Sequence, residues 1–235
     1  MTLEILADAD AVARRAAETI ADAARAAVQT RGRFVVAISG GRTPWLMLRM
    51  LSVLDVPWHD VHLLQVDERL APEGHEERNL THLRESLRGV GPHASPHIHA
   101  MPVESAAIDA AAARYAQTLA GLAGSPPVLD LVHLGMGADG HTASLVPGDP
   151  VLDVVDADVA VTGPYQGRRR MTLTYPVLNL ARRVLWLVTG EDKRTMLARL
   201  YRGDLSIPAG RVRRDCAMVL ADLAAAQQLA LRGDS

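Results

Sequence analysis

Residues 33–44 read Arg-Phe-Val-Val-Ala-Ile-Ser-Gly-Gly-Arg-Thr-Pro, a short apolar run that stops at a polar, glycine-rich turn. A run of this length next to a turn predicts a strand that is buried on both faces. In the turn, Thr43 is suited to cap a helix and Pro44 to take the first helical position. The stretch therefore predicts a strand that leads through a tight loop into a helix, the repeating unit of α/β proteins.

The same alternation of apolar runs and helical periodicity continues along the chain. We expect the first strand near residue 33 and further strands at 61–66, 97–101, 129–134, 158–162, 170–174, 184–188 and 217–220, with those at 158–162 and 170–174 paired. Helices are predicted at 8–29, 79–88, 104–122 and 191–202, and after the last strand. The expected fold class is α/β: a single domain over 1–235 with one doubly wound, mostly parallel, Rossmann-like sheet and helices on both faces.

Composition excludes several classes of function. The net charge of -2 creates no field that would attract nucleic acid or an anionic membrane, and no apolar run approaches the ~18 residues of a membrane span. The single cysteine, Cys216, excludes an internal disulfide, and the N-terminus lacks the basic and apolar segments of a signal peptide. We expect a cytoplasmic protein without nucleic-acid or membrane partners.

A second glycine-rich turn follows the strand predicted at 129–134. Residues 134–148 read Leu-Gly-Met-Gly-Ala-Asp-Gly-His-Thr-Ala-Ser-Leu-Val-Pro-Gly. Such a turn lets a ligand approach closely and presents His141, whose imidazole titrates near neutral pH and can take a proton from water. His141 is therefore the candidate general base. The alternative is a histidine beside a helix start, with Asp139 and Thr142 as caps.

The loop after the first predicted strand suggests an anion site. Ser39, Gly40, Gly41, Arg42 and Thr43 combine free backbone amides, hydroxyls and a cation at a helix N-terminus, which favours phosphate. The alternative is that Gly-Gly only turns the chain and Thr-Pro only starts the helix. The glycine spacing differs from that of dinucleotide-binding and Walker loops.

The strand at 61–66 ends in Asp67-Glu68-Arg69. In an extended chain, alternate positions place Asp67 and Arg69 on the same side, where they can hold and orient a polar ligand. The alternative is an exposed ion pair at a strand end.

Other chemistry has weaker support. Ser144 lacks the Gly-x-Ser-x-Gly elbow of a serine hydrolase, which disfavours a covalent serine mechanism. Two groups of histidines have a spacing that a metal tolerates, but no Cys or Glu cluster supports them, and we expect no metal. They are His59 with His62, and His93 with His97 and His99.

Taken together, these segments closely resemble the bacterial type of the 6-phosphogluconolactonase family, within the glucosamine- and galactosamine-6-phosphate isomerase superfamily. The resemblance rests on 39–44, 67–69 and 134–148, on Arg170-Met-Thr-Leu-Thr with Pro176 and 178–182, and on 189–193. It covers nearly the whole chain in order. It implies a fold of the deaminase/isomerase type and hydrolysis of 6-phospho-D-glucono-1,5-lactone in the oxidative pentose phosphate pathway, without metal or organic cofactor.

The expected mechanism joins the resemblance to the residues. His141 deprotonates a water that attacks the lactone carbonyl. The 39–43 loop, Arg170 and Lys193 hold the 6-phosphate, and Arg69 either joins them or stabilises the oxyanion. Asp67 completes the catalytic set, and the remaining expected substrate contacts are Asn79, Gly137 and Asp139.

Departures from the family pattern leave points open. Arg42 stands where serine is common, and Arg78 precedes Asn79 where serine is common. Residues 163–169 lack the usual prolines, so the sequence does not decide which of Arg168, Arg169 and Arg170 reaches the ligand.

Two other functions fit parts of the chain. A glucosamine-6-phosphate deaminase carries an acid in the turn where this chain has Val146, which cannot transfer a proton. A non-catalytic phosphosugar-binding module of a transcriptional regulator needs a helix-turn-helix, and one helix before the first predicted strand leaves no room for it. The sequence permits either a monomer or a homodimer, with a phosphorylated sugar lactone as the small-molecule partner.

Overall fold

The computed structural model describes residues 1–91 and 94–230. Its central element is a seven-stranded sheet in which every neighbouring pair is parallel, in the order β1-β10-β9-β6-β2-β3-β5. From one edge to the other, the strands are Thr2–Leu6 (β1), Ala217–Asp222 (β10), Val184–Val188 (β9), Leu131–Leu134 (β6), Phe34–Ile38 (β2), Val61–Gln65 (β3) and His97–His99 (β5). The carboxyl ends of all seven strands therefore lie at one edge of the sheet.

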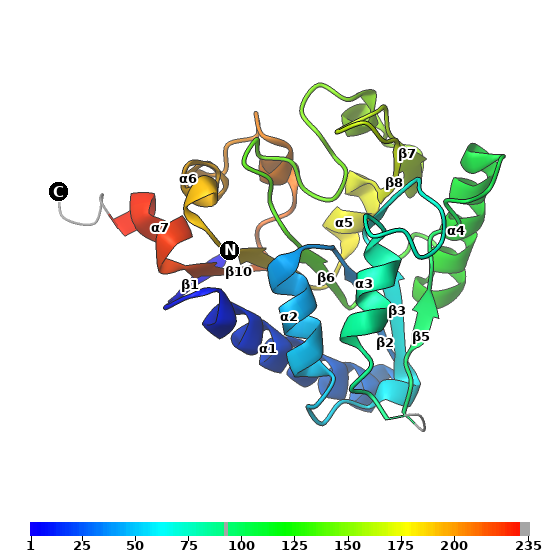
Figure 1. Ribbon diagram of the computed structural model, residues 1–235, viewed down its shortest axis with the longest axis horizontal. Coiled ribbons are helices and arrows are strands. Elements are labelled where there is room, and N and C mark those ends of the chain that lie inside the picture. Colours follow the sequence, from blue (N-terminus) through cyan, green and yellow to red (C-terminus); the bar gives the residue numbers. More distant parts are fainter. Residues whose placement is uncertain (92–93, 231–235) are drawn as a thin grey trace.

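Helices cover both faces of this sheet (Figure 1). One face is covered by Ala9–Arg31 (α1), Arg42–Leu51 (α2) and Asn79–Ser86 (α3). The other is covered by Ile108–Ala123 (α4), Tyr175–Leu180 (α5), Arg194–Arg202 (α6) and Leu223–Ala230 (α7). The connections contain short 3₁₀ helices at Trp58–Asp60 (η1), Pro150–Asp153 (η2), Glu191–Lys193 (η3) and Pro208–Arg211 (η4). The predicted fold class is confirmed.

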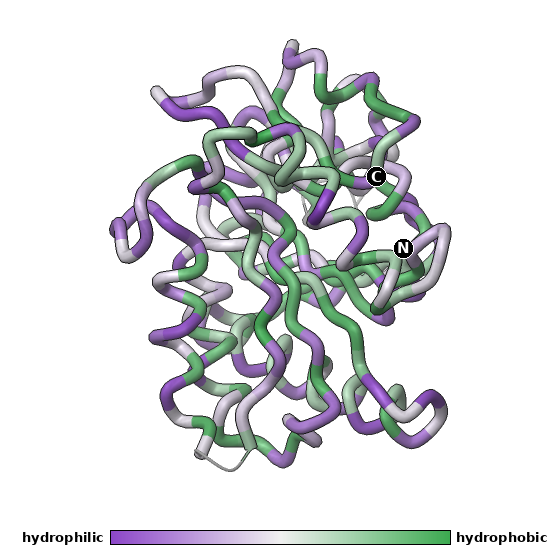
Figure 2. The backbone as a smooth tube through the Cα atoms, turned by 90° about the vertical axis from the view of Figure 1, so that its right-hand side faces the viewer, coloured by the Kyte–Doolittle hydropathy of each residue, from purple (hydrophilic) through white to green (hydrophobic). Residues whose placement is uncertain are grey.

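Strand β2 shows why an apolar run marks the middle of this sheet. Phe34, Val36 and Ile38 belong to the core on the α1 side, whereas Val35 and Ala37 belong to the core on the opposite face. Because side chains alternate along a strand, a strand covered on both faces has to be apolar at every position. Figure 2 shows hydrophobic residues concentrated along the strands in the middle of the molecule and hydrophilic residues at its rim.

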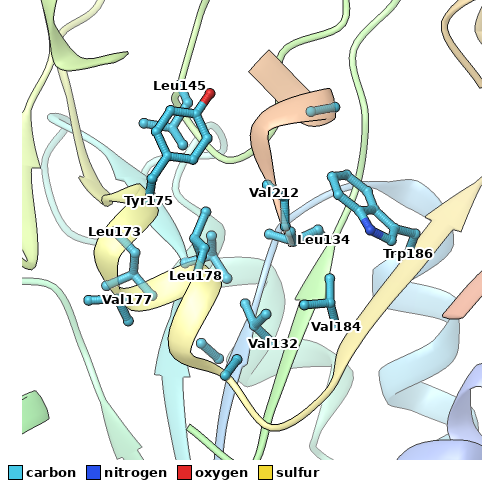
Figure 3. Packing of buried hydrophobic residues seen from close by; sticks show 14 of the residues in the cluster. Val132, Leu134, Leu145, Leu173, Tyr175, Val177, Leu178, Val184, Trp186 and Val212 are labelled. Carbon is cyan, nitrogen blue, oxygen red and sulfur yellow. The ribbon is translucent and has the colours of Figure 1, made fainter. Parts of the chain in front are cut away.

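The larger core fills the space between β6, β9 and α5. Val132, Trp186 and Leu178, one from each element, all belong to this core (Figure 3), and Trp186 is fully buried. The core also includes Leu145, from the turn that follows β6. Packing of this kind holds the ends of β6 and β9 in place, and the segments that leave those ends carry polar side chains.

Helix α1 has clear caps at both ends. Asp8 accepts a hydrogen bond from the Ala11 N–H at 2.8 Å and is therefore the N-cap, the residue before the helix. The predicted range of 8–29 placed Asp8 inside the helix and ended it two residues early. Gly32, with φ of 73°, ends the helix and donates its N–H to the Val28 carbonyl at 2.8 Å. Neither α1 nor any other described helix is both long and apolar enough to cross a membrane.

A second, three-stranded sheet was not expected from the sequence. It consists of Asp67–Arg69 (β4), Arg170–Leu173 (β8) and Val159–Val161 (β7), in the order β4-β8-β7 with antiparallel pairing. The predicted pairing of the last two segments is confirmed. The prediction that 67–69 simply ends the strand at 61–66 is wrong, because β3 stops at Gln65 and the chain then crosses to the second sheet. There, Arg69 lies opposite Arg170.

Two further predictions fail for identifiable reasons. The first strand is β1, not the run near residue 33, and β1 pairs on one side only, with β10. Its side chains are half-buried or exposed, so it lacks a continuous apolar run. The helix predicted at 191–202 divides into η3 and α6, although the two are continuous along the chain.

Candidate active site

A cavity of about 270 Å³ lies at the carboxyl ends of the parallel strands. The segments after β2, β6 and β9 contribute to its wall, together with β4 and β8 of the small sheet. Ligands of open α/β sheets bind at this edge. The predicted site residues that line the cavity are Ser39, Gly40, Gly41, Arg42, Thr43, Asp67, Arg69, Asn79, His141, Arg170 and Lys193.

The loop after β2 closes tightly over its neighbours. A Cβ on Gly40 would lie 2.0 Å from Asn79 Oδ1, so only glycine fits there. Gly41, with φ of 136°, is the N-cap of α2, which begins at Arg42. The prediction of Thr43 as the cap is therefore wrong. Thr43 lies in the first turn, and its hydroxyl is 2.8 Å from that of Thr189, after β9.

Basic side chains dominate the cavity wall. Arg42, Arg69, Arg170 and Lys193 line it, against the single carboxylate of Asp67. Arg170 is 5% exposed, and burial, together with the charge of Arg69, lowers the pKa of its guanidinium, while Asp67 works in the opposite direction. An anion in the cavity would relieve this repulsion. The charge distribution therefore suits a phosphorylated ligand.

The three consecutive arginines have different surroundings. Arg168 pairs with Glu77 at the surface, and Arg169 donates a hydrogen bond from Nε to the Thr162 carbonyl at 3.2 Å. Arg170 alone of the three lines the cavity, and its buried Nε has no hydrogen-bond partner among the described residues. Of the three arginines, Arg170 is therefore the one placed to contact a ligand in the cavity.

His141 is held by an acid from its own turn. Its Nδ1 lies 2.6 Å from Asp139 Oδ1, and its backbone N–H donates to the same oxygen at 3.1 Å. Burial works to raise the pKa of Asp139, but hydrogen bonds from His141 and from the Tyr165 hydroxyl outweigh it, so this pKa lies below its usual value. An ionised Asp139 makes Nδ1–H the donor and leaves Nε2 as the basic nitrogen.

Gly137 and Asp139 contact His141 but are not among the residues that line the cavity. A Cβ on Gly137 would lie 2.1 Å from His141 Nδ1, so glycine is what permits the Asp139 contact. No helix starts beside His141: the chain continues through a turn, closed by an isolated bridge between Thr142 and Leu145. The helix-start alternative for this histidine is therefore wrong.

Asp67 is locked in a buried network. Its Oδ2 accepts a hydrogen bond from Ser144 Oγ at 2.6 Å, and its carbonyl accepts one from Asn79 Nδ2 at 2.9 Å. Asn79 Oδ1 in turn accepts one from Arg69 Nη1 at 2.9 Å. Ser144 is fully buried and committed to Asp67, which agrees with the expectation that it is no nucleophile.

Glu68, which no sequence pattern singles out, holds the backbone of two residues in this network. Its side chain is fully buried and accepts hydrogen bonds from the backbone N–H groups of Arg69, Asn79 and Leu80, each at 2.8 Å. Arg78 Nε forms an ion-pair contact with it at 3.1 Å. The carboxylate therefore joins β4 to the start of α3 and fixes the two residues, Arg69 and Asn79, that reach the cavity.

The histidines considered for a metal group do not form one among the described residues. His62 Nδ1 and His99 Nε2 lie 3.0 Å apart at the edge of the sheet, and the rings of His62 and His97 stack. His93 lies outside the described residues.

Comparison with known proteins shows which family this chain is similar to. Residues 7–220 match the family model described as glucosamine-6-phosphate isomerases/6-phosphogluconolactonase. A 6-phosphogluconolactonase of Mycobacterium tuberculosis is 37% identical over 97% of this chain and 98% of its own, and one of a Nostoc species is 34% identical over 88% and 89%. The crystal structure of a 6-phosphogluconolactonase from Thermotoga maritima superposes with a TM-score of 0.82 at 27% identity, over 94% of this chain and 98% of the other.

Replacing Glu68 by Gln tests whether its buried carboxylate holds β4 and the start of α3 together. The change removes the charge at nearly constant shape and leaves the buried Arg78 with one longer ion-pair contact, to the exposed Glu104 at 3.6 Å. We expect it to lower the free energy of unfolding by about 3–5 kcal/mol, as measured by urea denaturation. The matched control is Glu76→Gln, an exposed glutamate nearby, which should change stability by less than about 0.5 kcal/mol. Equal effects of the two substitutions would show that Glu68 does not hold α3 and β4 together.

Proposed function

The chain belongs to the glucosamine-6-phosphate isomerase/6-phosphogluconolactonase family, and on that premise we propose that it hydrolyses 6-phospho-D-glucono-1,5-lactone to 6-phosphogluconate in the oxidative pentose phosphate pathway. One observation carries the proposal: a histidine whose Nδ1–H is committed to a carboxylate opens onto a cavity lined by four basic side chains. The proposed partner is thus a phosphorylated sugar lactone.

In the proposed reaction, His141 Nε2 takes a proton from water as the water oxygen attacks the lactone carbonyl. Asp139 keeps the ring in the required tautomer and stabilises the imidazolium that forms. The tetrahedral intermediate then collapses, the bond from the carbonyl carbon to the ring oxygen breaks, and the ring oxygen receives the proton from His141. Water is consumed and no proton is left on the histidine.

The basic side chains divide between two tasks in this proposal. The 39–43 loop, Arg170 and Lys193 hold the 6-phosphate, because the first turn of α2 offers free N–H groups and the cations offer charge-assisted hydrogen bonds. Arg69, fixed by Asn79, either joins them or stabilises the oxyanion as it develops. Asp67 orients Asn79 and the turn at Ser144.

We propose a cytoplasmic location for this reaction. Composition supports it: the one cysteine, Cys216, can form no disulfide within the chain, which suits a reducing compartment.

A direct assay tests the function. The purified protein should accelerate the opening of 6-phosphogluconolactone well above its spontaneous rate and should release no ammonia from glucosamine 6-phosphate. The absence of an acid at Val146, which is buried beside the turn, supports this outcome. Release of ammonia without lactone hydrolysis would instead establish a deaminase, and phosphosugar binding without either activity would establish a binding module.

His141→Ala tests the general base. We expect kcat to fall by about 10²- to 10⁴-fold with little change in KM, because general-base assistance contributes to the transition state and not to binding. The control is His59→Ala, which removes an exposed histidine far along the chain from the turn. Near-normal turnover of the His141 variant would refute its role.

Lys193→Ala tests the phosphate site. Lys193 is the only lysine in the chain, and its Nζ contacts the exposed carboxylate of Asp192 at 2.8 Å. We expect KM for the phosphorylated lactone to rise by about tenfold or more, the value of a charged hydrogen bond, with a much smaller change in kcat. Arg194→Ala, which removes the adjacent exposed cation, should leave KM unchanged. If the parent protein hydrolysed the unphosphorylated lactone equally well, the phosphate site would be refuted.

A further inference from the structure

A tight hairpin joins β7 to β8 and contacts residues of the candidate site. Tyr165 and Arg168 exchange two backbone hydrogen bonds, at 2.9 and 3.2 Å. The two residues between them, Gln166 and Gly167, both have positive φ, at 51° and 81°. This is the two-residue turn whose twist matches that of paired strands, so the tip of the hairpin is well defined.

Tyr165 makes three contacts from this tip, and all three are with proposed site residues or their supports. Its hydroxyl donates a hydrogen bond to Asp139 Oδ2 at 3.2 Å, the carboxylate oxygen that His141 does not use. Its ring lies edge-on to the His141 imidazole, with centroids 5.4 Å apart. The Arg170 guanidinium carbon lies 4.9 Å from the ring centroid, in the geometry of a cation–π contact.

These contacts connect two groups that the proposed reaction uses at opposite ends of the substrate. Asp139 orients the base, and Arg170 holds the phosphate. Gln166 reinforces the second connection, because its Oε1 accepts a hydrogen bond from Arg170 Nη2 at 3.2 Å. Burial and the negative charge of Asp139 raise the pKa of Tyr165, so its hydroxyl stays protonated as a donor.

We propose that Tyr165 is a positioning residue that fixes the Asp139–His141 pair relative to Arg170, through its hydroxyl on one side and its ring on the other. The inference rests on the proposed function, since it assigns the hydroxyl contact to turnover and the ring contact to phosphate binding. It also accounts for the glycine-containing turn at 166–167, which places one aromatic ring between the base and the anion site.

Two substitutions separate the effect of the Tyr165 hydroxyl from that of its ring. Tyr165→Phe removes the hydroxyl and keeps the ring, so kcat should fall by about tenfold with KM unchanged, as expected for the loss of one hydrogen bond to a charged group. Tyr165→Leu also removes the ring from Arg170 and should in addition raise KM about two- to fivefold. The control is Tyr201→Phe, which removes a hydroxyl from a tyrosine that is 42% exposed and should change neither constant.

A double-mutant cycle separates an effect of the Tyr165 hydroxyl through Asp139 from a general effect of the substitution on folding. If the hydroxyl acts through Asp139, Tyr165→Phe should have no further effect on kcat in the Asp139→Ala background. Fully additive losses, or a Phe variant with wild-type kcat, would overturn the proposal. So would a Leu variant with wild-type KM.

A binding measurement distinguishes failure of this inference from failure of the proposed function. Calorimetric titration with 6-phosphogluconate should show weaker binding to the Leu variant and unchanged binding to the Phe variant, whether or not the parent protein turns over the lactone. If the three proteins bind 6-phosphogluconate in this order but the parent protein does not hydrolyse the lactone, the proposed function is refuted. The role of the Tyr165 ring in holding Arg170 is then still supported. Equal binding by all three proteins would refute the ring's part.

Discussion

The buried carboxylate of Glu68 is the interaction on which the site's geometry depends. Two charges, Glu68 and Arg78, are removed from water in a part of the molecule where an unpaired charge would be costly. The carboxylate is satisfied by three backbone N–H groups and by Gln65 Nε2 at 2.7 Å. Those donors come from the end of β3, from β4 and from the start of α3, so one side chain determines how three elements meet.

This meeting point explains why the chain leaves the parallel sheet after β3. Because β4 pairs with β8 instead of extending β3, Arg69 is brought opposite Arg170, although the two are far apart in sequence. Two cations on neighbouring strands repel, and pairs of like charge destabilise a sheet unless something compensates. Asn79 and Gln166 each hold one of the guanidinium groups, and Asp67 lies close enough to act on the charge of Arg170. The surrounding residues thus hold two positive charges close together at the cavity, where an anionic ligand can bind them.

The sequence predicted features that local chemistry determines. The apolar runs of β2 and β9, the Gly-Gly loop and His141 could all be found because glycine, proline and hydrophobic spacing act over a few residues. Features that depend on distant pairing were missed. The crossing of Asp67–Arg69 to a second sheet depends on β8, a hundred residues later, and the half-exposed strand β1 is recognisable only beside β10. Asp139 is expected from the sequence as a ligand contact or as a cap, because nothing in the spacing shows that its carboxylate turns back toward the His141 ring.

The contrast between Arg170 and Lys193 shows how the proposed phosphate site combines two kinds of cation. Arg170 is buried, its guanidinium lies over the Tyr165 ring, and its Nη2 donates a hydrogen bond to Gln166, so its orientation is fixed. Lys193 is the chain's single lysine, on a flexible stem, and its partner Asp192 is exposed and therefore weakly bound. A fixed guanidinium can define where a phosphate sits, whereas a mobile ammonium can follow it as the sugar ring opens. The product of the proposed reaction is longer and more flexible than the lactone, so one rigid and one adaptable contact suit the proposed phosphate site.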